Sequence, residues 1–144
     1  MKPAAFIPDG HTFHGLLESP LHRDVEIEWR PATHEQRQAS QRLVNSLIEK
    51  KSSASQITDS VILTICDFLV AWDVVDNQGE AVKIEPNVFK KNIHPDLTEV
   101  VFAVVLGNIS PSKWIGESDD RNDTDARAEY DAVMGRAVQT DSGN

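Results

Sequence analysis

The sequence predicts an α+β fold that is mainly α-helical, with a small N-terminal β-hairpin, three to four packed helices and a mobile acidic tail. Apolar and charged residues alternate over residues 23–30, which is typical of a half-buried strand. Apolar residues recur at helical spacing in three segments farther along the chain. Residues 117–144 hold eight acidic residues and three arginines and offer few apolar residues to bury.

The hairpin is expected from two short segments. Every second residue from Val25 to Trp29 is apolar, and Pro31 then ends the strand because proline donates no ladder hydrogen bond. Residues 12–17 form the partner strand and reach the first through Ser19-Pro20.

The first helix is expected to begin near His34 and to end at Lys50-Lys51. Thr33 and Gln36 have the spacing of a capping box, in which each side chain satisfies a free backbone donor of the other residue. The apolar residues of this helix form one narrow stripe: Leu43, Val44, Leu47 and Ile48.

The second helix is expected over residues 56–72 and is apolar on nearly all sides. A helix of this kind is buried either in the core of its own domain or in an interface with another chain, and the sequence leaves both open. Asp76 to Gly79 then forms a turn, and residues 81–84 a brief extended segment.

A short helix is expected to start at Pro86, and a longer one to cover residues 95–108. The valines of the longer segment also allow a strand. Pro95 with Asp96 favours the helix, since proline and an acidic residue are typical of a first helical turn.

The chain is expected to form one globular domain over residues 1–116, followed by a flexible acidic tail over 117–144. Of 144 residues, 40% are hydrophobic and 26% are charged, which is the balance of an ordinary globular protein. The net charge of −9 disfavours nucleic acid and anionic lipid as partners. The longest apolar stretch, residues 61–70, is too short to span a membrane.

We expect a cytoplasmic protein, because no secretion signal precedes the domain and Cys66 is the single cysteine. No metal site is expected from His11, His14 and His22, which lack the accompanying ligands that zinc needs. A calcium loop is excluded because Val75 stands where an oxygen ligand is required. The chain also lacks a nucleophile elbow and a phosphate-binding glycine pattern, so no catalytic site and no cofactor are expected.

The order of elements around Trp72 resembles that of tail assembly chaperones of long-tailed bacteriophages. The resemblance comprises a helix that ends in Trp72-Asp73, an Asp-rich turn from Asp76 to Gly79, the extended residues 81–84 and the helices that follow. Upstream, Trp29-Arg30-Pro31 matches the aromatic-Arg-Pro step that ends a strand in such proteins. The segment before Leu21 has no counterpart in this pattern.

The resemblance implies a protein of the infected host cytoplasm that binds the tape-measure protein, helps recruit tail-tube subunits and is absent from the finished virion. It also implies copies of the same chain as partners. Trp72, Asp73, Asp76 and Gly79 are then a structural corner. A candidate partner surface is expected at Ile62, Leu63, Leu69, Val70, Val101 and Val105.

Two other classes of function stay open. One is a structural subunit of the virion, such as a tail-completion or head–tail connector protein. The other is a small enzyme of unrecognised type, for which His34 or His94 beside acidic residues in a pocket would be the first indication.

Overall fold

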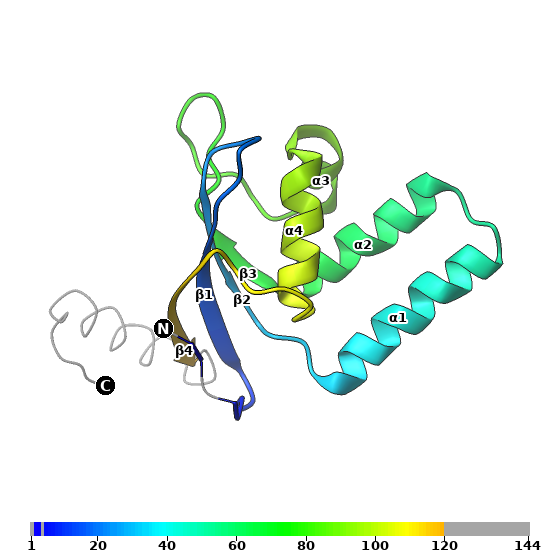
Figure 1. The fold of residues 1–144 in the computed structure, drawn as a ribbon. Helices are drawn as coiled ribbons and strands as arrows, with labels where there is room; N and C mark the ends of the chain where they lie inside the picture. The colour runs from blue at the N-terminus through cyan, green and yellow to red at the C-terminus, as the bar shows by residue number, and fades with distance from the viewer. Residues whose placement is uncertain (1, 4, 120–144) are drawn as a thin grey trace, which may run out of the picture.

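The computed structural model describes residues 2–3 and 5–119. The elements of this part of the chain follow one another in the order β1 (His11–Leu17), β2 (Val25–Trp29), α1 (His34–Glu49), α2 (Ala54–Phe68), β3 (Leu69–Trp72), α3 (Pro86–Asn92), α4 (Pro95–Val105) and β4 (Lys113–Asp119). The strands form one antiparallel sheet in the order β3-β2-β1-β4. The helices lie on one side of this sheet (Figure 1).

The expectation of a mainly helical fold with a small hairpin is wrong, because the sheet has four strands. The hairpin itself is present, with β1 and β2 paired antiparallel from Phe13↔Trp29 to Leu17↔Val25. Strand β3 pairs with the other edge of β2, and strand β4 with the other edge of β1. The hairpin is therefore the centre of a larger sheet.

Strand β3 takes the place of the last turn of the helix expected over residues 56–72. Helix α2 ends at Phe68, and Leu69 and Trp72 pair with Trp29 and Ile27 of β2. A short continuous apolar run suits a buried strand as well as a buried helix, so its periodicity does not distinguish the two. The open edge of β2 decides in favour of the strand, because pairing satisfies backbone groups on both strands.

Strand β4 covers residues 113–119, where the sequence pattern predicts no helix or strand. The Trp114 ring packs edge-to-face against Phe13, with centroids 5.6 Å apart, and lies 5.8 Å from the ring of Trp29. Residues 117–119, expected in the acidic tail, continue the strand beyond the expected domain end at residue 116. The rest of that expected tail, residues 120–144, lies outside the described residues.

Helices α1 and α2 both begin at capping boxes. At α1, Thr33 Oγ1 accepts from the Gln36 backbone N–H, and the Gln36 side chain accepts from the Thr33 N–H, which confirms the expected start. Ser53 and Gln56 make the same reciprocal pair at α2. Helix α2 therefore starts before residue 56, the start expected from the sequence.

The core lies between the sheet and helices α2 and α4. Its most completely buried side chains include Leu17, Trp29, Ile62, Ile65, Val101 and Val105. The helix expected over residues 95–108 is present as α4, which ends earlier, at Val105, and is a helix rather than a strand because its buried valines recur at helical spacing. No helix in residues 2–3 and 5–119 is both long and apolar enough to cross a membrane.

Candidate functional site

Trp72 lies half-buried at the end of β3, where it joins the sheet to the loop that follows. Its Nε1–H donates to the Val82 carbonyl at 2.7 Å, and its ring lies 5.1 Å from the ring of Phe89 in α3. The indole thus holds two segments that are ten and seventeen residues away in sequence. Trp72 and Asp73 end a strand here, which differs from the helix end in the chaperone pattern.

The carboxylates of the expected structural corner bind backbone groups. Asp73 Oδ1 accepts from the Glu26 N–H at 2.9 Å and so extends the pairing of β3 with β2. Asp76 Oδ1 accepts from the N–H groups of Gln78 and Glu80. The hydrogen bond from Glu80, followed by that from Gln78, lowers the pKa of the Asp76 carboxyl below its usual value.

Gly79 has a φ of +80°, a conformation that suits glycine because it has no Cβ. The turn from Asp76 to Gly79 is closed by hydrogen bonds between Asp76 and the residues that follow it. Both carboxylates of the corner are thus engaged with the backbone, and the contacts of this corner are those of a structural turn.

The candidate partner surface is not a surface in this fold. Ile62, Leu69, Val101 and Val105 lie in the core, because α2 and α4 pack against each other and against the sheet. Val70 is half-buried in β3. Leu63 alone among the six expected residues is exposed, at 56%.

Helix α1 is the element that the core leaves uncovered. It has sixteen residues, and none of its side chains is buried. Leu43 is 48% exposed and Ile48 is 57% exposed, although α1 packs on α2. No residue from 33 to 60 belongs to the core or to the half-buried side chains packed on it. We call residues 33–60 the helical arm, which extends away from the sheet in Figure 1.

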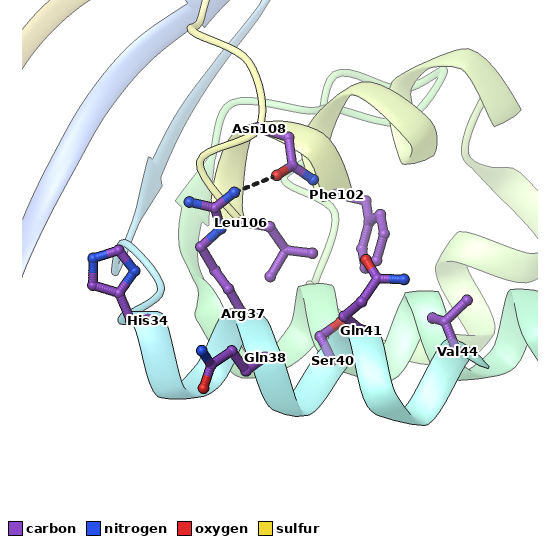
Figure 2. A pocket seen from close by; sticks show the side chains of 9 residues that line it. All are labelled: His34, Arg37, Gln38, Ser40, Gln41, Val44, Phe102, Leu106 and Asn108. Carbon is purple, nitrogen blue, oxygen red and sulfur yellow. Dashed lines mark hydrogen bonds between the residues drawn. The ribbon is translucent and has the colours of Figure 1, made fainter. Parts of the chain in front are cut away.

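A groove of about 440 Å³ lies between α1 and the C-terminal end of α4. We call it the α1–α4 groove, and it is lined by His34, Arg37, Gln38, Ser40, Gln41, Val44, Phe102, Leu106 and Asn108. Figure 2 shows Val44 of α1 and Phe102 of α4 at one end of the groove, and Arg37 with Asn108 toward the other.

Polar and apolar residues are interspersed along the groove, with Leu106 beside Arg37 and Gln41 beside Phe102 (Figure 2). Arg37 Nη2 donates to Asn108 Oδ1 at 2.9 Å, and this bond links α1 to the segment after α4. Within residues 2–3 and 5–119, no carboxylate forms an ion pair with Arg37. An apolar wall beside an unneutralised guanidinium fits an apolar segment that also carries a carboxylate.

Sequence reasoning found only one wall of this groove. The apolar stripe of α1, which includes Val44, is visible in the sequence. Phe102 lies in α4 and is half-buried against the core, and Leu106, which follows the helix, is itself a core residue, so nothing in the sequence separates them from the other core residues. An apolar stripe on a helix that the core does not use is the signal that locates the site.

The histidines do not form one cluster, but His22 and His94 lie together, with ring centroids 5.3 Å apart, and both line a cleft that also includes Asp24, Asp73 and Asp76. His11 Nε2 lies 2.5 Å from Glu117 Oε1, and His14 Nε2 lies 3.6 Å from Glu28 Oε2, so both hold strands of the sheet together. His94 Nδ1 accepts from the Asp96 N–H at the start of α4. In the part of the chain that the structure describes, no group of three histidine, cysteine or acidic residues is arranged to hold a metal ion.

Cys66 lies half-buried in α2 against the core. Burial, and secondarily the charge of Asp67, raises the pKa of its thiol above the usual value. A raised pKa keeps the thiol protonated near neutral pH, which disfavours a nucleophilic role.

Comparison of the chain with known protein families, with characterised proteins and with solved structures finds no match.

Proposed function

We propose that this chain is a non-catalytic assembly chaperone that binds an amphipathic helix in the α1–α4 groove. The observation that carries the proposal is the exposure of α1, a capped helix of sixteen residues with no buried side chain. Because α1 contributes no side chain to the core, its packing within the fold is mainly its contact with α2. A bound segment that covers the half-buried Val44 and Phe102 would remove apolar surface from water.

The chemistry of the groove defines the segment that fits. Apolar side chains at helical spacing would lie against Val44 and Phe102, and a carboxylate about one or two turns away would pair with Arg37. An ion pair at this exposed site contributes about 0.2–1 kcal/mol, so apolar contact supplies most of the affinity. Binding should therefore show a negative heat-capacity change and persist at moderate salt.

The tape-measure protein is the partner that we propose. Before the tail tube encloses it, a long helical tape-measure chain exposes apolar faces that require cover. This assignment rests on the order of elements around Trp72 that resembles tail assembly chaperones. The proposal includes action in the host cytoplasm, recruitment of tail-tube subunits and absence from the finished virion.

Co-expression with the proposed tape-measure partner, followed by affinity capture, tests the proposal. Val44→Glu places a charge in the groove and should reduce capture at least tenfold. Leu43→Glu is the matched control, because Leu43 is the adjacent apolar residue of α1 and does not line the groove. Capture of neither wild type nor control, with the chain present in purified particles, would favour the connector function instead.

A further inference from the structure

A second cleft, of about 400 Å³, lies between the β1–β2 loop, the loop after β3 and the turn before α4. We call it the loop cleft. Its apolar lining includes Val74, Ile93 and Leu97, and its charged residues include the carboxylates of Asp24, Asp73 and Asp76. Arg23 is the one lysine or arginine in the lining. The loop cleft therefore combines an apolar lining with an excess of negative charge.

The opposite combination occurs at the end of the helical arm. Ile48 is exposed, and Lys50 and Lys51 follow it at the turn between α1 and α2. Lys51 has a φ of +56°, so the chain reverses sharply at this point. We call residues 48–51 the arm tip. It presents one apolar side chain beside two ammonium groups and the exposed Glu49 carboxylate, a net charge of +1, at the end of a projection from the fold (Figure 1).

We propose that the arm tip of one copy of this chain binds in the loop cleft of a second copy. Ile48 would contact the apolar lining of the cleft, while Lys50 and Lys51 would lie near Asp24, Asp73 and Asp76. Asp73 and Asp76 each use one oxygen for backbone hydrogen bonds, and their negative charge still acts on a nearby ammonium group. Charge and apolar surface are both complementary.

The two surfaces lie on different parts of one molecule, with the arm tip at one side and the loops at the top in Figure 1. A contact between two different surfaces is heterologous, so each copy keeps a free arm tip or a free cleft after a dimer forms. Copies therefore add head to tail. The α1–α4 groove does not include residues 48–51 and stays available in such an assembly.

Two variants isolate the contact. Asp24→Lys places a positive charge at the cleft; Asp24 is exposed and has no hydrogen bond or ion pair with another described residue. Ile48→Gln with Lys50→Gln removes the apolar side chain and one charge from the exposed arm tip. The control, Lys83→Glu with Lys113→Glu, changes two exposed lysines that lie outside both surfaces. Thermal melts and far-UV circular dichroism check that each variant folds.

Sedimentation velocity on the full chain is the measurement. At about 100 µM and low salt the wild type and the control should associate, and association should weaken at least tenfold at about 500 mM salt. Each surface variant alone should stay monomeric. An equimolar mixture of the two should form dimers and nothing larger, because it retains one intact arm tip and one intact cleft per pair.

A monomeric wild type at low salt would overturn the proposal. So would a surface variant that associates as the wild type does, or a mixture that stays monomeric while the wild type associates. The experiment contains no partner protein, so its failure leaves the proposed helix-binding function unaffected.

Discussion

Trp72 connects three parts of the chain through one side chain, and its removal should be costly. Trp72→Ala would lose the packing on Phe89 and the hydrogen bond to Val82, and we expect a loss of about 2–4 kcal/mol in the free energy of unfolding. Trp72→Phe keeps an aromatic ring and should lose about 1–2 kcal/mol. Urea titration checks both, and a loss below about 1 kcal/mol for the alanine variant would show that the corner does not depend on Trp72.

Asp76 should make stability depend on pH in the acid range. Its pKa is lowered in the folded chain, so its carboxylate stabilises the fold above the usual value of 3.8. That contribution is lost as the pH falls below 3.8 and through the lowered pKa. Asp76→Asn lacks this titration, so the difference in urea midpoint between wild type and variant should shrink on acidification. A difference that stays constant down to about pH 2.5 would contradict the assignment.

Residue 15 must be glycine because Pro111 and the Trp29 ring lie close to its backbone. A Cβ added at residue 15 would lie 2.7 Å from Pro111 Cβ and 3.2 Å from the Trp29 ring. Both neighbours are buried, so neither moves freely, and Gly15→Ala should destabilise the fold by about 1–3 kcal/mol. A thermal melt compares it with Ala71→Gly, an exposed change in β3. A smaller loss for Gly15→Ala than for Ala71→Gly would contradict the packing described here.

At the scale of elements, the sequence predicted the segments whose local pattern is unambiguous. The alternation in β2 and the capping box of α1 depend on neighbouring residues, and both are present. Strands β3 and β4 form because they pair with the hairpin edges, which are distant in sequence. In the sequence, Leu69–Trp72 continues the apolar pattern of a helix, and residues 117–119 begin an acidic segment. Neither pattern indicates a strand or the strand with which it pairs.

Strand β4 should be essential to the domain. A chain that ends at Ser112 loses Trp114 from its contacts with Phe13 and Trp29, whereas a chain that ends at Asp119 keeps the strand. Loss of a buried aromatic residue typically removes about 3–5 kcal/mol, so the shorter chain should melt more than about 10 °C below the longer one. Equal melting temperatures would show that the sheet is stable without β4.

The α1–α4 groove could be predicted only in part from the sequence. The stripe containing Val44 was visible, but the sequence assigned the exposed faces to α2 and α4, whose buried residues proved to fill the core. An apolar residue in a sequence looks the same whether it faces the core or a partner. The crossing of α4 over α2 decides which it is, and that crossing is a tertiary property.

At the scale of the whole molecule, a sheet with one helical layer carries a helical arm that the core leaves uncovered (Figure 1). The net charge of −9 is unevenly placed: residues 33–51 hold four lysines or arginines and two glutamates, while the loop cleft is acidic. The arm thus carries one wall of the α1–α4 groove along its side and the arm tip at its end.

Site-specific photocrosslinking tests the central claim, that the α1–α4 groove receives a helix, most directly. A benzophenone amino acid that replaces Gln41 would lie in the groove. The same amino acid in place of Arg42 would lie at the next position of α1, which is exposed and does not line the groove. In cells that co-express the proposed tape-measure partner, we expect position 41 to crosslink to an apolar helical segment at least fivefold more than position 42. Equal yields at the two positions, or a higher yield at Arg42, would contradict the account.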